Sequence, residues 1–462
     1  DGILVIAKSG ASSGALGTGA FAFNGGTLRT TFGSGLVGAD AISNAIQLNA
    51  SPPKVDGNLS IQFSGAVTMG ASRNLQNELG VGAQLILSGT VTNSAASTLT
   101  IFGAGDTLIS GTVTTGTGAQ GLTYSGTGTM TLTGANNAIG ALTVNRGLTV
   151  ISGANGAWTG AGSSYALNAG GTLKLDNSGT NNSNRLLDAG AITFNGGTLQ
   201  LIGNTTAETA GAVTVSTIMA KILMSGTGSN TLTFASISLG NTGSTLDLSG
   251  VTGLGVANKV FFTTSTGLNV SNGVAARVFI GGTDFATYGV NGVAALAAGS
   301  YNTGNNLNTA AATDTLNLTA NATISNNRTI NAIKINGDGL TLGSANGNIL
   351  TLTSGGLINS VGDNTLAQSN IALGANTGYF QVQTGTTLNV TGSITGTGSF
   401  ASALGGTLVF SGFQYYSGTT NILGGTLKLN AGTNTIYPSL GVLNIGVGAT
   451  LDLNGNTQYV GQ

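Results

Sequence analysis

One tetrapeptide, Gly-Gly-Thr-Leu, recurs along the chain and constrains its fold more than any other feature. Copies begin at Gly25, Gly170, Gly196, Gly405 and Gly424. The interval from Gly170 to Gly196, and that from Gly405 to Gly424, are each close to the roughly 20–30 residues of one solenoid circuit. In a solenoid each repeat packs only against its neighbours, so the copies are expected to stack.

Apolar and polar residues alternate at the end of the tetrapeptide and just after it. In one copy Leu173 and Leu175 alternate with polar residues, and in another Leu427 and Leu429 do the same. A period of two is typical of a β-strand with one buried and one solvent-exposed face. We therefore expect these leucines to point into a core.

The paired glycines predict sharp corners between short strands, because glycine adopts backbone angles closed to other residues. A hairpin turn uses the same residues, but short strands in recurring circuits favour corners. The predicted corner residues are Gly25, Gly26, Gly170, Gly171, Gly196, Gly197, Gly405, Gly406, Gly424 and Gly425.

These patterns predict an all-β parallel solenoid, a single elongated rod that runs continuously over residues 1–462. Loop excursions are expected near residues 38–57, 205–224 and 281–313. The first contains Pro52 and Pro53, which cannot serve a central strand, and the other two contain Ala-rich windows without clear helix caps.

Low charge excludes several classes of partner and site. Charged residues make up 6% of the chain and the net charge is −1. Nucleic acid is not an expected partner, because phosphate binding needs clustered Lys and Arg. No apolar run is long enough for a membrane helix, so we expect no membrane insertion by this segment.

The chain has neither Cys nor His. A thiol nucleophile, a disulfide framework and the commonest general base and metal ligand are therefore absent. We expect no enzyme activity, no cofactor and no metal site.

Two segments carry a family resemblance. Residues 411–429, which end in Gly-Gly-Thr-Leu-Lys-Leu, resemble the passenger-associated, autotransporter-associated β-strand repeat of bacterial surface proteins, and residues 132–144 are a looser copy. The resemblance implies a right-handed parallel β-helix that is extracellular and displayed at the bacterial cell surface.

Carboxylates are the remaining candidates for chemistry. Asp314, Asp338 and Asp363 follow one another at nearly equal intervals, each close to one circuit. They could therefore share one face and act on a glycosidic bond as paired acids. The favoured alternative places each in a turn. Glu208 is one of two Glu in the chain, and a salt bridge or a solvated loop is its favoured role.

Four aromatic residues, Trp158, Tyr165, Tyr415 and Tyr416, are candidates for a sugar-stacking platform, although such residues more often cover a solenoid edge or corner. The Gly-Gly-x-Gly-x-Asp repeat of stacked calcium sites is absent.

The sequence favours a structural role in a surface rod, fibre or biofilm matrix. Residues 2–7 form an apolar strand candidate and residues 449–457 still carry the repeat, so both ends are expected to pair. The expected partners are copies of the chain or further solenoid rungs of the same polypeptide, and surface glycans are a further candidate. The alternative is a glycan-binding adhesin passenger, and a polysaccharide lyase or hydrolase is less favoured.

Overall fold

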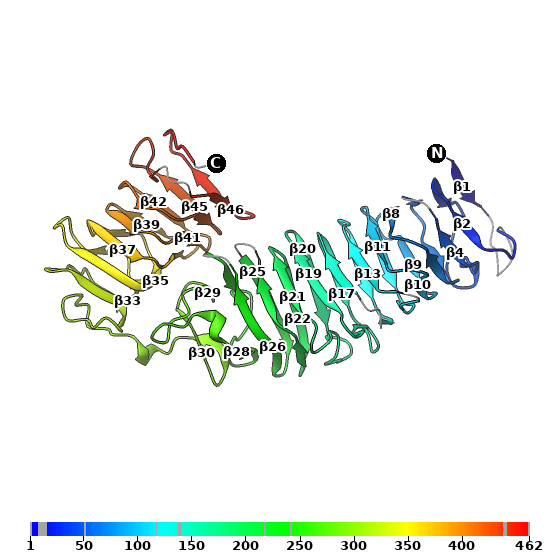
Figure 1. The fold of residues 1–462 in the computed structure, drawn as a ribbon, viewed down its shortest axis with the longest axis horizontal. Helices are drawn as coiled ribbons and strands as arrows, with labels where there is room; N and C mark the ends of the chain where they lie inside the picture. The colour runs from blue at the N-terminus through cyan, green and yellow to red at the C-terminus, as the bar shows by residue number, and fades with distance from the viewer. Residues whose placement is uncertain are drawn as a thin grey trace. The chain divides into compact units, whose positions relative to one another are not determined.

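The computed structural model describes residues 2–7, 16–49, 52–116, 118–136, 140–216, 219–240, 243–437 and 441–460. Regular structure in these ranges is nearly all β-strand, and parallel strands stack rung upon rung (Figure 1). Helical turns in the described ranges are limited to η1 (Gly38–Asp40), η2 (Thr266–Leu268) and η3 (Ala298–Ser300). The predicted all-β parallel solenoid is confirmed. No helix in the described ranges is long and apolar enough to cross a membrane.

The chain divides into two compact units, where the sequence predicts one continuous solenoid. The first unit comprises Asp1–Thr214, Lys221–Ser236 and Ala257–Thr263. The second comprises Val215–Ala220, Ile237–Val256 and Thr264–Gln462. Regular rungs are interrupted over residues 237–313, which hold short strands, η2, η3 and an antiparallel hairpin. This interruption gives each unit its own stack of rungs.

The first unit is built mainly from three parallel sheets, one along each face of the rungs. The first face is β1 (Ile3–Ile6), β3 (Thr27–Thr30), β5 (Lys54–Gly57), β8 (Arg73–Leu79), β11 (Ser97–Phe102), β13 (Gln120–Tyr124), β16 (Ala141–Val144), β19 (Ser164–Asn168) and β21 (Ile192–Asn195). The second is β6 (Ile61–Phe63), β9 (Gln84–Leu87), β12 (Asp106–Ile109), β14 (Thr129–Leu132), β17 (Gly147–Ile151), β20 (Gly171–Asp176), β22 (Thr198–Asn204) and β25 (Met219–Thr227). The third is β2 (Phe21–Phe23), β4 (Ile46–Leu48), β7 (Val67–Met69) and β10 (Val91–Asn93), with β15 (Ala135–Asn136) and β18 (Ala157–Trp158) as a separate pair.

The second unit repeats this plan with a long central strand. Strand β35 (Ile349–Val361) pairs with both β37 (Asn370–Gly374) and β38 (Gly378–Val382), so it serves two faces. The strands stacked beside β35 are β32 (Thr315–Leu318), β33 (Arg328–Asn336), β40 (Ser393–Gly396), β41 (Phe400–Ala403), β43 (Tyr415–Tyr416), β44 (Thr420–Ile422) and β46 (Leu443–Ile445). The other sheet is β34 (Thr341–Leu342), β36 (Asn364–Leu366), β39 (Thr387–Val390), β42 (Thr407–Phe410), β45 (Thr426–Leu429) and β47 (Thr450–Asp452).

Of the remaining strands, two precede β25 in the sequence and the others follow it. They are β23 (Ala207–Ala210), β24 (Val213–Val215), β26 (Asn230–Leu239), β27 (Thr245–Asp247), β28 (Asn258–Thr264), β29 (Val278–Phe279), β30 (Ala286–Gly289) and β31 (Gly292–Ala295). Strands β30 and β31 form the antiparallel hairpin.

In-register leucine stacks form the core of both units. Leu173 pairs with Leu199 and Leu175 with Leu201 on the next rung, and all four are fully buried. Leu427 pairs with Leu408 in the same way in the second unit. Burial of one such side chain stabilises the fold by about 1.5–3 kcal/mol. Stacking of buried leucines from rung to rung thus explains the alternation seen in the sequence.

Uncharged side chains stack on the outer face without repulsion. Thr100, Thr123 and Thr143 lie in register on three successive rungs. On another three rungs Asn168 donates to the Oδ1 atom of Asn145 at 2.6 Å, and Asn195 donates to Asn168 at 2.7 Å. Such ladders satisfy the amides within the rungs, which is consistent with the low charge of the chain.

The paired glycines lie at the corners, and each has a steric reason to be glycine. Gly170 has φ of +84°, a conformation that side chains rarely adopt, and a Cβ on Gly171 would lie 2.4 Å from the carbonyl oxygen of Val144. A positive φ also occurs at Gly25, Gly26, Gly196 and Gly425. A Cβ would lie under 3.0 Å from a neighbouring atom at Gly197, Gly405, Gly406 and Gly424.

Of the three segments expected to be loop excursions, two contain regular rung strands in the structure and one leaves the rungs. Residues 38–57 include β4 and β5 as regular rung strands. Residues 205–224 are mostly strand, with β23, β24 and the start of β25, because their Ala and Thr residues alternate between buried and wet faces. Residues 281–313 do leave the rungs, as the hairpin and η3.

The segment over residues 264–313 covers the outer face of strands in the second unit. Phe285, Leu296 and Tyr301 of this segment form a second hydrophobic cluster with Ala332 of β33 and Ile358 of β35. Both faces of these strands are therefore buried, and the alternation of apolar and polar residues is lost there.

Candidate functional site

Asp338 and Asp363 lie on successive rungs, and both carboxylates act as turn acceptors. The backbone N–H of Asp363 donates to Oδ1 of Asp338 at 2.8 Å. The N–H of Thr387 donates to Oδ1 of Asp363 at 2.7 Å. Each carboxylate therefore holds the corner of the next rung, as local hydrogen bonding of Asp in turns predicts.

Asp314 does not join these two carboxylates. The circuit that follows it is short, since Thr315 pairs with Ala332. Asp314 is consequently aligned with Asn331, whose N–H donates to its carbonyl oxygen, whereas Asp338 follows the end of β33. Within the described ranges no group of three acidic residues is placed to hold a metal ion.

Glu208 accepts two backbone hydrogen bonds in a fully buried position on β23. The N–H of Leu186 donates to Oε1 at 2.8 Å, and the N–H of Arg185 donates to Oε2 at 3.2 Å. Burial raises the pKa of Glu208 to about 7, although these two hydrogen bonds and the nearby Arg185 charge oppose the rise. The Glu208 carboxylate therefore accepts the backbone hydrogen bonds of Arg185 and Leu186, in the segment that precedes β21, in place of a neighbouring strand.

Arg185, which the sequence analysis does not single out, is fully buried beside Glu208. Its Nε donates to Oδ1 of Asn177 at 2.6 Å. Its two terminal nitrogens donate to four carbonyl oxygens, those of Gly153, Gly156, Asp176 and Thr180, at 2.8–3.1 Å. Desolvation lowers the pKa of Arg185, while Glu208 and Asp176 raise it. All of the guanidinium nitrogens bond to groups of the chain, which identifies a structural clamp rather than a reactive group.

Three of the four aromatic candidates for a sugar platform are buried. Trp158 donates from Nε1 to the carbonyl oxygen of Gly140 at 3.0 Å, and Tyr165 donates to that of Trp158 at 2.6 Å. The hydroxyl of Tyr416 lies 2.8 Å from that of Thr420. These three residues are buried members of strands β18, β19 and β43, and Tyr415 alone among the four is exposed.

Tyr415 is one of three exposed tyrosines, and the other two are not among the candidates predicted from the sequence. Tyr437 and Tyr459 follow it at equal intervals of one circuit each. The exposed fractions of Tyr415, Tyr437 and Tyr459 are 52%, 56% and 65%. Equal spacing by one circuit is the signal that finds this group.

Backbone and side-chain bonds place the three tyrosines on successive rungs. The N–H of Tyr437 donates to the carbonyl oxygen of Gln414, and the N–H of Ile436 donates to Oε1 of Gln458 at 3.0 Å. The rings of Tyr415 and Tyr437 have centroids 6.0 Å apart and are inclined at 45°.

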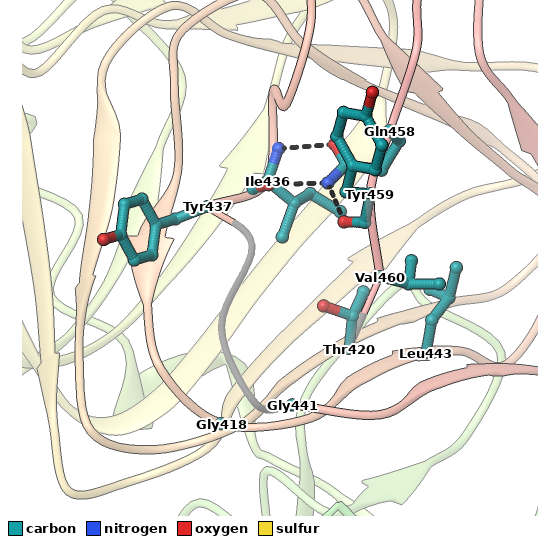
Figure 2. A pocket seen from close by; sticks show the side chains of 9 residues that line it. All are labelled: Gly418, Thr420, Ile436, Tyr437, Gly441, Leu443, Gln458, Tyr459 and Val460. Carbon is teal, nitrogen blue, oxygen red and sulfur yellow. Dashed lines mark hydrogen bonds between the residues drawn. The ribbon is translucent and has the colours of Figure 1, made fainter. Parts of the chain in front are cut away.

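A pocket opens between the last two of these rungs. In Figure 2 the Tyr437 ring points away from the pocket on one side of Ile436, and Gln458 and Tyr459 lie on the other side. The pocket is lined by Gly418, Thr420, Ile436, Tyr437, Gly441, Leu443, Gln458, Tyr459 and Val460.

Comparison with known proteins shows that the chain is similar in sequence to an adhesin. The chain is 25% identical over 390 residues to the adhesin BmaC autotransporter of Brucella suis biovar 1 (strain 1330), an alignment that covers 82% of this chain. The aligned region is 9% of the length of that relative. No family model matches the chain, and no solved structure matches it. The β-solenoid and this similarity together support an autotransporter-like β-helical protein, and membership in the particular strand-repeat family stays a prediction.

Proposed function

We propose that the chain is a structural β-solenoid segment of a bacterial surface protein, whose end rungs pair with further rungs. The partners are copies of the chain or other rungs of the same polypeptide, and the product is a surface rod or fibre. The observation that carries the proposal is the open rung at β1. Surface location is supported by the similarity to an autotransporter adhesin and by the uncharged outer ladders.

In the described part of the chain, strand β1 has no partner strand on one backbone edge, and its core-facing Leu4 is partly exposed. The strand pairs with β3 on its other edge and is the terminal strand of its sheet in the described ranges. Leu4 stacks on the fully buried Leu28 but is itself 39% exposed. An unpaired parallel edge is a template for another strand. The open end is lined by Gly2, Ile3, Leu4, Phe21, Ala22, Phe23, Asn24, Gly25, Thr27 and Leu28.

Strands β46 and β47 are the corresponding terminal strands of the second unit. Ile445 of β46 is 51% exposed, and Leu451 of β47 continues the stack above Leu427. Within 453–462 the sequence has no charged residue, so little electrostatic repulsion opposes stacking at this end.

The assembly test replaces Leu4 with lysine. A charge that points into the open core blocks strand addition, and we expect Leu4→Lys to remain folded because the side chain is already partly exposed. Val81→Lys, at a fully exposed position, is the matched control. Electron microscopy and light scattering should show end-to-end oligomers for the wild type and the control, and monomers for Leu4→Lys. Monomeric wild type would defeat the self-stacking proposal.

A role without catalysis is the second part of the proposal. Asp338 and Asp363 are engaged as acceptors for backbone N–H groups, which supports a role in holding corners. Turnover of a polyuronate or a neutral glycan that disappears in Asp338→Asn would contradict it.

Glycan binding is a second candidate function, and the exposed tyrosines favour it. Adhesion and scaffolding are compatible, because a rigid solenoid can present a binding surface on one of its rungs.

A further inference from the structure

We infer that Tyr415 and Tyr437 form a platform that binds an uncharged glycan chain. The inference rests on the proposed surface location, because the platform must face external glycans. It adds to that function a named site and a class of ligand.

Tyr415 and Tyr437 are both strongly exposed. Tyrosine usually buries its ring and leaves its hydroxyl in contact with solvent. Tyr415 and Tyr437 each expose more than half of their surface. The other large aromatic nearby, Phe413, is 44% exposed. An exposed patch of large aromatic side chains is more typical of a binding surface than of the ordinary surface of a monomer.

The spacing of the Tyr415 and Tyr437 rings suits consecutive sugars. The two rings come from successive rungs, and their centroids lie 6.0 Å apart. This advance is comparable to that between neighbouring rings of an extended polysaccharide. The apolar faces of two consecutive sugars can therefore rest on two consecutive tyrosines, while hydroxyl and amide groups of the rungs meet the sugar hydroxyls. The rungs hold both backbones in place, so little conformational entropy is lost on binding.

The sequence around the two tyrosines is nearly free of charge. The sequence has no charged residue between Asp363 and Lys428, a stretch that includes Tyr415. Tyr437 lies between Lys428 and Asp452, and these two residues form an ion pair at 3.6 Å on the separate sheet of β45 and β47. An acidic polysaccharide would find no cation at the platform, and a charged protein surface would lose hydration without gaining an ion pair. The uncharged surroundings fit a neutral glycan.

The test measures binding of neutral glucan and mannan hexasaccharides to the full chain by calorimetry and by ligand-observed NMR, with a polygalacturonate hexamer for comparison. Wild type should bind a neutral hexasaccharide and not the acidic one. The double variant Tyr415→Ala/Tyr437→Ala should bind at least about tenfold more weakly, since each ring contact contributes up to about 1.5 kcal/mol.

Conservative and distant variants separate stacking from general effects. Tyr437→Phe retains the ring and should keep affinity within about threefold. Leu4→Lys lies in the other unit and should bind like wild type, so loss of assembly and loss of glycan binding are distinct results. Unchanged circular dichroism checks that each variant is folded. No binding of any neutral hexasaccharide, binding of the acidic one alone, or undiminished binding by the double alanine variant would each overturn the inference.

Discussion

Replacement of Arg185 by methionine tests the buried clamp of the first unit. Arg185→Met keeps much of the side-chain volume but removes every guanidinium donor. Four backbone carbonyl oxygens and Oδ1 of Asn177 then each lose a donor. Asn182 still donates to two of these acceptors, Oδ1 of Asn177 and the carbonyl oxygen of Gly156. Glu208 also loses the positive charge that favours its ionised form.

The expected loss in free energy of unfolding is about 3–5 kcal/mol, the usual effect of removing one partner from a buried charged network. A buried polar group left without a hydrogen bond costs about 1–3 kcal/mol, so five such groups would exceed this range. The donors that Asn177 and Gly156 retain from Asn182 reduce the cost. Water entering beside the less buried carbonyls reduces the sum. Neutralisation of Glu208 reduces it further, because the pKa of this carboxyl is already about 7.

Hydrogen exchange with mass spectrometry measures the effect where it should occur. Peptides that span positions 177–191 should lose protection by about 2 to 3.5 powers of ten, at about 1.4 kcal/mol per tenfold change. Peptides from the second unit should exchange as in wild type. Urea unfolding then gives the change in stability, fitted without assuming a single step because stacked repeats need not unfold together.

Arg146→Met is the matched control. Arg146 is exposed and donates from Nε to the carbonyl oxygen of Ser125 at 2.8 Å, so its loss should change stability by less than about 0.5 kcal/mol. If Arg185→Met were no more destabilising than Arg146→Met, the clamp would have no part in holding this region.

Three further predictions concern the same unit. The pKa of Glu208 in the folded protein is raised from 4.5 to about 7, so its contribution to stability is fully present below pH 4.5 and is lost as pH rises through 7. The free energy of unfolding of wild type should fall by at most about 3 kcal/mol over this window. Urea titration at several pH values should show that Glu208→Gln lacks this pH dependence. Leu173→Ala should destabilise by about 2–5 kcal/mol, whereas Thr172→Ala on the wet face should stay within about 0.5 kcal/mol; equal midpoints in urea would contradict the stacked core. Gly171→Ala should destabilise because its Cβ would meet the Val144 carbonyl at 2.4 Å, and Gly179→Ala should not because nothing lies within 4 Å; the comparison is made by thermal melting.

The repeat predicts the fold well because each rung buries the same alternating set of apolar side chains. Leu173 and Leu427 could be assigned to the core from period two alone, and both are buried. Tyr415 and Tyr416 are adjacent in the sequence, so strand alternation alone requires that one point outward and the other inward.

Features outside the repeat could not be derived in this way. The Asp314 position follows from an unusually short circuit, in which Thr315 pairs with Ala332, and circuit length is set by corners that the alternation does not encode. Arg185 lies in an irregular segment, where the partner of a buried charge depends on the path of the backbone. The second hydrophobic cluster forms because residues 264–313 fold onto β33 and β35, which no local pattern predicts.

Labelling of introduced cysteines on intact cells tests the central proposal most directly, because the chain has no cysteine of its own. Val81 is fully exposed in the turn after β8, and Leu85 on β9 is fully buried in the core. For a surface-displayed solenoid, a membrane-impermeant maleimide should label Val81→Cys on intact cells and Leu85→Cys only after denaturation. Labelling of Val81→Cys only after lysis would contradict surface display, and equal labelling of both variants on intact cells would contradict the folded solenoid.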